Sequence, residues 1–312
     1  LAAGKLRHTS PAFAEDPLRV LRAMQRAARF DIEVVPETVA LCRGIEPEGL
    51  TSERIFGEWT KLITLGRVPS RGMTFLRDSG WLKYFPELEA LIGVPQEPQW
   101  HPEGDVWVHT LHCLDAFAAE KTGHPWEDLV VGLAVLCHDL GKPDTTVRDD
   151  KGVIRSLEHE KRGVRVTEDF LGRMTSHRKL LKEVTPLVAE HMRPTQLFQA
   201  EASDAAVRRL AARVGRIDRL VRVARADVFG RPPLPADDYP AGDWLLEEAR
   251  RLGIECRPPE PLVLGRHLMA LGQKPGPVFG EILGKCYEAQ LAGKFTTVEK
   301  GVEYAKRMLD RF

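Results

Sequence analysis

Residues 130–142 read VVGLAVLCHDLGK, an apolar run that ends in an adjacent histidine and aspartate, His138 and Asp139. An imidazole and a carboxylate in such apolar surroundings are costly to bury unless they have a partner. Together they form a mixed nitrogen and oxygen site for a borderline divalent ion. Because a bound cation would remove the cost of burial, the stretch predicts a metal site at the end of a buried helix.

The composition is that of an ordinary folded protein. The chain has 312 residues, which favours two or three domains, and its 45 basic residues balance 45 acidic ones. Net charge therefore indicates no class of partner, and only its local distribution can do so. No apolar stretch approaches the length of a membrane span, so we expect no membrane partner.

The five cysteines are scattered and include no CxxC pair. This spacing argues against a zinc ribbon and against a disulfide framework, and it favours a reducing compartment, so we expect a cytoplasmic protein. The first residue is Leu1 and not methionine. We expect the chain to be the later part of something longer.

Apolar residues recur at helical spacing nearly throughout, which predicts an all-α, multi-helical fold. Helices are expected at about 18–28, 52–63, 73–76, 106–120, 126–138, 161–174, 178–191, 204–229 and 240–256, with two more around a loop at 272–277. A short hairpin is possible at 145–156. The Pro-rich segment 95–102 is a boundary signal. We therefore expect three parts, at 1–94, at 95–232 and at 233–312.

The metal candidates extend beyond the adjacent pair. His109 lies on an expected helix, and Asp227 lies near the end of another. With His138 and Asp139 they would supply two imidazoles and two carboxylates, which leaves positions for water and a phosphate oxygen on an octahedral ion. Two neighbouring side chains can reach one ion only where their helix ends, and Gly141 is expected to end it. Each histidine taken singly could equally be a surface or core residue.

The order of these residues resembles the HD phosphohydrolase superfamily, whose pattern is a His, then His-Asp, then further His, then a distant Asp. The resemblance implies an all-helical, metal-dependent phosphatase or phosphodiesterase, with His138 and Asp139 in catalytic positions and Lys142 as a phosphate contact. It adds His159 and His191 as ligands of a second metal or contacts of the phosphate. The ion could be Mn, Ni, Co, Fe or Mg. A Lys after a helix end can also simply balance the helix dipole.

Residues 13–23, FAEDPLRVLRA, carry a second resemblance, to the nucleotide-selecting motif of bacterial tRNA nucleotidyltransferases and related poly(A) polymerases. It implies that Glu15, Asp16 and Arg19 face an incoming base, with Arg22 beside them. Asp16 and Arg19 lie three apart, on one face of a helix, and could together accept from an amino group and donate to a ring nitrogen. The alternative is a plain surface ion pair at a helix start.

Further segments are similar to the same family. They are residues 52–62, 80–88, 101–110, 274–277 and 289–293, and they resemble its neck helix, the segment after it, the entry to an inserted HD domain and its tail. The family's catalytic head, with an Asp-x-Asp metal pair, should precede Leu1. Because the sequence has no Asp-x-Asp pair, we expect this chain alone to polymerise nothing, and we expect a head segment encoded upstream as its partner.

RNA, most simply tRNA, is the expected macromolecular partner. Seven arginines stand against one acid between Arg208 and Arg225, and the chain from Pro261 has eight Lys/Arg against five Asp/Glu. Neutralising phosphates is the usual reason for such local excess, which makes Arg208, Arg209 and Lys274 candidates for RNA contact. The alternative is a solvated helix face.

Two functions remain open. In the first, the HD site hydrolyses a phosphoester such as a 2′,3′-cyclic phosphate or an RNA 3′ phosphate, by activating a water. In the second, the HD fold is inert and the chain is a non-catalytic RNA-binding module that serves an upstream head. Metal binding discriminates between them.

Overall fold

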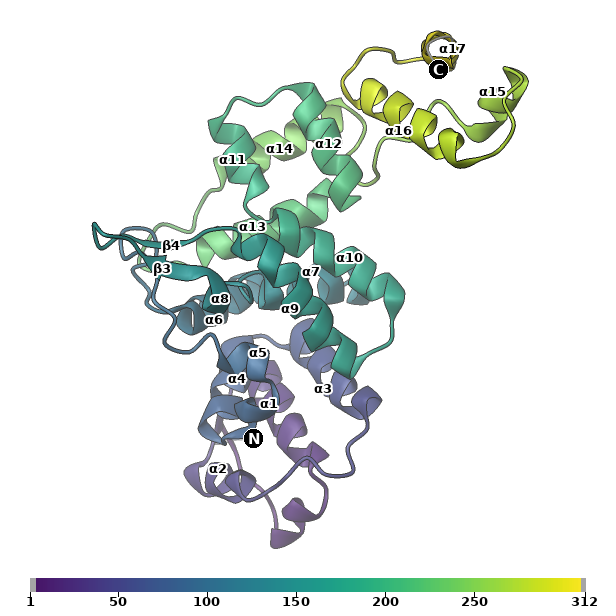
Figure 1. Cartoon of the computed structure of the whole chain (residues 1–312). Coiled ribbons are helices and arrows are strands. Elements are labelled where there is room, and N and C mark those ends of the chain that lie inside the picture. Colours follow the sequence, from purple (N-terminus) through teal and green to yellow (C-terminus); the bar gives the residue numbers. More distant parts are fainter. Residues whose placement is uncertain (1–3, 310–312) are drawn as a thin grey trace. The chain divides into compact units, whose positions relative to one another are not determined.

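Helices form most of the chain in the computed structural model, which describes residues 4–309 (Figure 1), so the all-α prediction is confirmed. The chain divides into two compact units. Unit 1 comprises the chain up to Arg193 together with Arg219–Pro240, and unit 2 comprises Pro194–Asp218 and the chain from Ala241. The three-part division predicted at 94/95 and 232/233 remains a prediction. None of the helices in the described range 4–309 has the length and apolar character needed to cross a bilayer.

The elements of unit 1 run in chain order. Its helices are η1 (3-10, Pro11–Glu15), α1 (Leu18–Phe30), α2 (Pro36–Arg43), α3 (Ser52–Leu65), α4 (Pro69–Asp78), η2 (3-10, Trp81–Tyr84), α5 (Pro86–Glu89), α6 (Val106–Ala119), α7 (Pro125–Cys137), α8 (Lys142–Thr145), α9 (His159–Met174), α10 (Arg178–Glu190) and most of α13 (Ile217–Phe229). Its strands are β1 (Lys5–Leu6) and β2 (Glu33–Val34), which pair in parallel, and β3 (Thr146–Arg148) and β4 (Ile154–Ser156), which form the predicted antiparallel hairpin.

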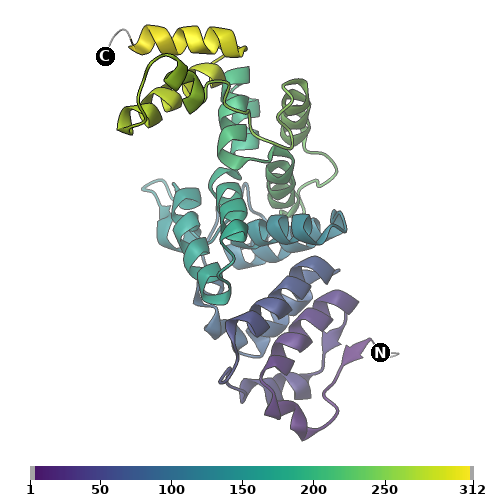
Figure 2. The ribbon, with the colours of Figure 1, turned by 90° about the vertical axis from the view of Figure 1, so that its right-hand side faces the viewer.

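The first part of unit 1 is held together by α1, which packs against α3 and α4 (Figure 2). The apolar stripe of α1 is buried, as its spacing predicts. A Cβ added to Gly72 of α4 would lie 2.6 Å from the carbonyl oxygen of Met24, so glycine lets the two helices approach closely. Trp59 of α3 extends this core by edge-to-face contacts with Phe85 and Phe170, with ring centroids 5.0 and 5.9 Å away.

The second part of unit 1 is built around α7, which packs against α3, α6 and α10. Every residue of α7 from Asp128 to Cys137 is buried, which accounts for its unbroken apolar run. Gly132 sits where α7 meets its neighbours: a Cβ there would lie 2.4 Å from a methyl carbon of Ile63 and 2.6 Å from the ring of Phe117. The helix that ends directly before His138 is therefore enclosed on several sides.

Unit 2 contains α11 (Arg193–Gln199, from its second residue), α12 (Asp204–Val214), α14 (Pro240–Arg251, from its second residue), α15 (Gly265–Ala270), α16 (Pro277–Leu291) and α17 (Val298–Leu309). Its tail has a small core of its own, which includes Leu268, Ile282, Phe295 and Ala305. The tail holds three helices where two were expected, because α17 follows the pair around the predicted loop.

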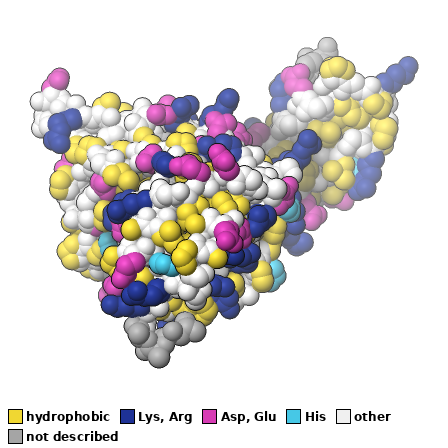
Figure 3. Space-filling model, turned by 90° about the horizontal axis from the view of Figure 1, so that it is seen from below, with side chains coloured by type: hydrophobic (Ala, Val, Ile, Leu, Met, Phe, Trp, Pro, Cys, Tyr) yellow, Lys and Arg dark blue, Asp and Glu magenta, His cyan; other side chains and the backbone are white. Residues whose placement is uncertain are grey.

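The single Arg-rich helix predicted at 204–229 is wrong. The chain forms two helices there, α12 and α13, and Gly215 between them adopts a φ of 73°, which ends α12. The charges of the chain are also well mixed. On the face drawn in Figure 3, basic and acidic side chains are interspersed.

Candidate metal centre

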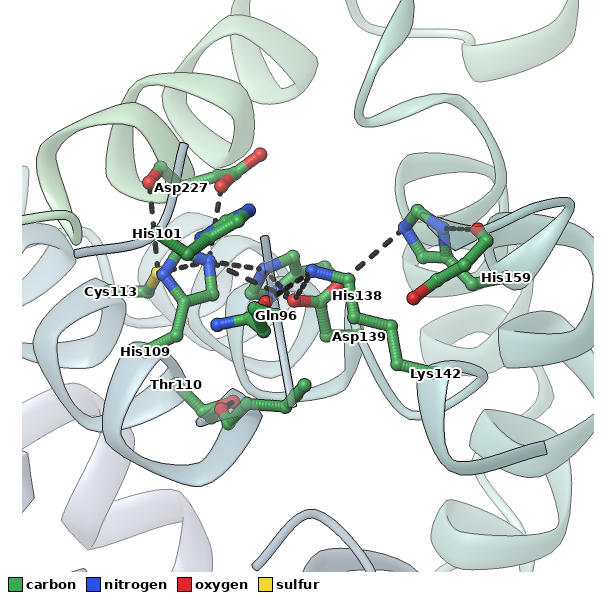
Figure 4. Close-up of polar contacts among 12 residues, drawn as sticks. Gln96, His101, His109, Thr110, Cys113, His138, Asp139, Lys142, His159 and Asp227 are labelled. Carbon is green, nitrogen blue, oxygen red and sulfur yellow. Dashed lines mark hydrogen bonds and ion pairs between the residues drawn. The ribbon is translucent and has the colours of Figure 1, made fainter. Parts of the chain in front are cut away.

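The six side chains predicted to bind metal come together in unit 1, although they belong to five separate segments (Figure 4). They are His109 in α6, His138 and Asp139 directly after α7, His159 at the start of α9, His191 directly after α10 and Asp227 in α13. All but Asp227 have exposed fractions of 5% or less. The side chain of Asp227 is 23% exposed, so the cluster reaches solvent beside it.

Three of the histidines are oriented by hydrogen bonds to the carbonyl oxygen three residues before them. Nδ1 of His138, His159 and His191 lies 2.7, 2.7 and 2.8 Å from the carbonyl oxygens of Val135, Ser156 and Val188. A carbonyl oxygen only accepts, so each Nδ1 carries a proton, and in the neutral imidazole that a metal requires each Nε2 is left with its lone pair. Metal-binding histidines are held in the same way.

His109 is oriented by two oxygens of different kinds. Its Nδ1 lies 2.7 Å from Oε1 of Glu103 and 3.2 Å from the carbonyl oxygen of Gly230. Both groups accept, so Nδ1 is again the donor and Nε2 again carries the lone pair. Glu103 was not among the residues predicted from sequence, because nothing in its spacing from His109 indicates contact.

The Nε2 atoms point at one another. Nε2 of His109 lies 3.4 Å from Nε2 of His138 and 3.2 Å from Oδ1 of Asp227, and Nε2 of His159 lies 3.3 Å from Nε2 of His191. Facing lone pairs repel unless a cation lies between them. An ion with bonds of about 2.0–2.3 Å needs neighbouring ligand atoms about 3.0–3.6 Å apart, which fits these separations.

Asp139 connects the two pairs of histidines. Its Oδ2 lies 3.3 Å from Nε2 of His138, and its Oδ1 lies 3.3 Å from Nε2 of His159. The Nζ of Lys142 lies 2.7 Å from Oδ2, yet neither oxygen of this buried carboxylate accepts a well-oriented hydrogen bond. A buried carboxylate in this condition is costly, so the residues fit a divalent metal that both oxygens could coordinate.

The electrostatics of the cluster follow from burial and close charges. Burial by itself lowers the pKa of His138, but Asp139 outweighs it and raises this pKa to about 10. Burial favours the neutral form of Asp139, but His138 and Lys142 hold its pKa well below the usual range. Burial and the neighbouring imidazoles His138 and His159 lower the pKa of His191 to about 3. Without a metal, a protonated His138 would balance the negative charge of Asp139. A cation would take their place.

Gly141 acts differently from the prediction. It was expected to end α7, but the helix already ends at Cys137, and Gly141, with a φ of −85°, directly precedes α8. A Cβ on Gly141 would lie 2.0 Å from the carbonyl oxygen of His159 and 2.6 Å from the amide nitrogen of Gly163. Glycine is therefore needed so that the turn after His138 can touch the start of α9.

Two further residues of the cluster were missed from sequence. Cys113, expected only as part of a helix, lies with its Sγ 3.3 Å from Nε2 of His109. Gln96, in the Pro-rich segment, accepts a hydrogen bond of 2.7 Å from Nζ of Lys142. The available signal for Cys113 was its place four residues after His109, which puts both on one helix face. Gln96 offered no such signal.

The nucleotide-selecting residues lie in a different place, at the start of α1. Asp16 precedes the helix in extended backbone, so the prediction that it shares a helical face with Arg19 is wrong. Its carboxylate instead accepts from the amide of Leu18 and pairs with Arg22 and Arg54, at 3.6 and 3.1 Å. Arg19 donates to the carbonyl oxygen of Ala12.

A cavity of about 330 Å³ lies beside these residues. Arg19 and Arg22 line it, together with Arg26, His8 and Phe13. Glu15 is exposed and is not part of the lining. The cavity thus combines guanidinium groups with an aromatic ring.

The candidate RNA contacts of unit 2 are partly neutralised. Arg208 pairs with Asp204 at 3.3 Å and Arg209 with Glu288 at 3.2 Å, while Lys274 lies in an exposed loop. The next helix, α13, shows the same pattern. Within unit 1, its Arg219 forms ion pairs with Glu127 and Glu183 and is 7% exposed. Part of the local basic excess in the sequence is therefore balanced by acids, from the same helix for Arg208 and from other segments for Arg209 and Arg219.

Comparison with known proteins agrees with this architecture. Residues 106–229 match the HD domain family. A CCA-adding enzyme structure in complex with CTP aligns with 99% of this chain and 64% of its own, at 17% identity and a TM-score of 0.52. An apo form of a CCA-adding enzyme aligns with 97% of this chain and 62% of its own, at 15% identity and a TM-score of 0.51. The chain thus has the fold of these enzymes and spans less than two thirds of their length, which confirms both resemblances expected from its motifs at the level of fold.

Proposed function

We propose that this chain, an HD domain set within the fold of CCA-adding enzymes, is a metal-dependent phosphohydrolase. One observation carries the proposal: imidazole lone pairs and carboxylate oxygens from five segments converge in a buried cluster that is incomplete without a cation. Burying the carboxylate of Asp139 without a well-oriented hydrogen bond costs free energy, and a purely structural role does not account for this cost. The cluster also reaches solvent at Asp227, where a substrate could enter.

The residues of the cluster would have two roles, metal binding and phosphate binding. His109, His138, Asp139 and Asp227 would hold one divalent ion, and His159 and His191 would hold a second ion or the substrate phosphate. A divalent ion at such a site acts as a Lewis acid on phosphate and lowers the pKa of water. Lys142, 8% exposed, places its ammonium at the edge of the cluster, where it can stabilise charge on a phosphate. Gln96 and Asp139 hold that ammonium in place.

The substrate class that we propose is an RNA-derived phosphoester, either a 2′,3′-cyclic phosphate or a 3′ phosphate. The fold similarity to CCA-adding enzymes and the resemblance of residues 13–23 to the tRNA nucleotidyltransferase motif support this choice. Fold similarity alone does not determine function, so the choice needs a direct assay.

The test compares hydrolysis of 2′,3′-cyclic AMP, a 3′-phosphorylated oligonucleotide and bis(p-nitrophenyl) phosphate in the presence of Mn²⁺, Ni²⁺, Co²⁺ or Mg²⁺. We expect Asp139→Ala to abolish activity while the chain stays folded. Asp169→Ala, at an exposed carboxylate of α9, is the matched control. Metal binding without hydrolysis of any phosphoester would reject the proposal and favour the inert, RNA-binding alternative.

A second function is supported by the cavity beside α1. We infer that Arg19 and Arg22, with Asp16 paired to Arg22, select a nucleotide there when a catalytic head is present, since a CCA-adding enzyme of the same fold was solved with CTP. With such a head restored, Arg19→Ala should relax the choice between CTP and ATP and leave the melting temperature nearly unchanged. A loss of stability with the nucleotide preference intact would assign Arg19 a structural role.

A further inference from the structure

A buried thiol lies inside the metal centre, and the HD pattern of histidines and aspartates does not include it. Cys113 of α6 is fully buried, and Figure 4 shows its sulfur between His109 and Asp227. We propose that Cys113 is a metal ligand, as a thiolate beside His109, His138 and Asp227, and that the centre therefore selects a borderline ion such as Zn²⁺, Co²⁺ or Fe²⁺ over Mg²⁺. The proposal rests on the metal centre of the proposed function and names a ligand and a class of ion for it.

The sulfur lies among the candidate ligand atoms of the cluster. Sγ of Cys113 lies 3.3 Å from Nε2 and 3.7 Å from Nδ1 of His109, so it lies beside the imidazole ring, somewhat closer to the nitrogen that points into the cluster. Bonds of about 2.3 Å to sulfur and 2.0–2.1 Å to nitrogen, at angles of a four- to six-coordinate ion, place the two atoms about 3.1–3.6 Å apart. The ligand atoms of His109, Cys113, His138 and Asp227 all lie within 4.8 Å of one another.

A second observation, independent of the cysteine, also indicates a cation at this place. Both oxygens of Asp139 are buried without a well-oriented hydrogen bond, and Oδ2 lies 3.8 Å from the Nε2 of His109 that the sulfur contacts. The cluster therefore contains, besides the thiol, a buried carboxylate that accepts no well-oriented hydrogen bond and lies close to the same imidazole. One ion can satisfy both groups.

Gly230 packs directly against Cys113, where a larger residue than glycine would clash. A Cβ added to Gly230 would lie 2.3 Å from Sγ and 2.8 Å from the amide nitrogen of Cys113. Gly230 also accepts from Nδ1 of His109 through its carbonyl oxygen, at 3.2 Å. The same glycine thus positions the imidazole and the thiol together.

The chemistry of the thiol determines the selectivity. The carbonyl oxygen of Asp227, 3.9 Å from Sγ, is too distant for a strong bond, so the main partner of the thiol proton is Nε2 of His109. On metal binding this proton leaves to solvent and the sulfur coordinates as a thiolate. Thiolate favours borderline and soft ions, whereas Mg²⁺ favours oxygen ligands.

The experiment titrates the full chain with Co²⁺ and records its absorption. We expect a thiolate-to-cobalt charge-transfer band in the near ultraviolet that saturates together with the visible cobalt bands. Cys113→Ser should remove the charge-transfer band and raise the Co²⁺ dissociation constant at least about tenfold, with smaller effect on Mg²⁺ binding. Cys137→Ala, at the buried cysteine next to His138, and Cys42→Ala should retain the band.

Visible cobalt bands without the charge-transfer band in the unaltered chain would overturn the proposal, and so would a band that survives Cys113→Ser. If Cys113→Ser does not fold, X-ray absorption of the unaltered cobalt form decides: one Co–S distance near about 2.3 Å supports the ligand, and a shell of nitrogen and oxygen only rejects it. These readouts do not depend on hydrolysis. A full charge-transfer band with no phosphoesterase activity would reject the proposed function and leave the ligand assignment intact.

Discussion

Gly141 and His159 are in contact so close that a Cβ on the glycine would lie 2.0 Å from the histidine's carbonyl oxygen. Gly141 follows the His138–Asp139 pair and His159 opens α9, so this contact sets the separation between the two halves of the metal cluster. Any residue larger than glycine at position 141 would therefore push the start of α9 away.

We therefore expect Gly141→Ala to damage the metal centre. The added methyl group should push α9 away and cost about 1–3 kcal/mol of unfolding free energy, as overpacking does. Metal affinity should fall as well, because Nε2 of His159 would leave Asp139, 3.3 Å away. Urea unfolding and isothermal titration with Mn²⁺ measure the two effects. Gly172→Ala, at an open helix position, is the control and should change neither.

Glu103 is expected to act on the metal through His109. Its carboxylate lies 2.7 Å from Nδ1 of His109, and its own side chain is fully buried. Removing such a partner usually costs about 10–100-fold in metal affinity, because the imidazole loses its orientation and basicity. Glu103→Ala should show this loss by metal titration, whereas Glu168→Ala, at an exposed position of α9, should not. Equal affinities for both variants would mean that Glu103 is a structural residue only.

Asp128 should make the stability of the chain depend on pH. Burial by itself raises the pKa of Asp128, but hydrogen bonds from Thr122, Gly123 and Arg222 outweigh it and lower this pKa. An aspartate whose pKa is depressed by folding stabilises the folded state above its unfolded pKa of about 3.9 and loses this effect as the pH falls further.

The variant Asp128→Asn should therefore be less stable by about 1–3 kcal/mol at neutral pH, since charged hydrogen bonds are lost. The difference from the unaltered chain should stay constant down to about pH 4.5 and shrink below about pH 4. Chemical unfolding at several pH values tests this. A difference that grows on acidification would show that the sign of the pKa shift is wrong.

We expect this 312-residue chain alone to incorporate no CTP or ATP into tRNA, because it contains no Asp-x-Asp pair to hold the metals of phosphoryl transfer. Incubation of the pure chain with labelled CTP and a tRNA that lacks its 3′ end is the measurement. Incorporation above the background of a boiled sample would mean that the polymerising carboxylates lie elsewhere in this sequence.

Much of the fold could be predicted because the local pattern and the tertiary environment agree. The apolar run before His138 predicted a buried helix, and α7 is buried from Asp128 to Cys137. The stripe of α1 likewise predicted its buried face. The break at Gly215 was not predicted, since the apolar spacing continues across it and only the backbone conformation interrupts the helix.

Part of the candidate site could likewise be predicted from the sequence, and part could not. The sequence by itself determined which side chains have metal chemistry: the order of His109, His138–Asp139 and Asp227 predicted a cluster that the structure assembles. Only the tertiary structure decided what surrounds them. The contact of Glu103 with His109 depends on the path of the loop before α6. Spacing put Cys113 on the helix face of His109, but only the packing of α6 decided that this face meets the cluster.

The arginines of residues 208–225 show why charge partners could not be predicted from residue order. Along the chain the arginines from Arg208 to Arg225 stand almost without acids, and this excess suggested RNA contact. In the folded chain, carboxylates from distant segments reach them, as Glu127 and Glu183 reach Arg219 within unit 1. Coulombic attraction acts through space and not along the sequence, so residue order determined the chemistry available, and tertiary packing decided which groups are partners.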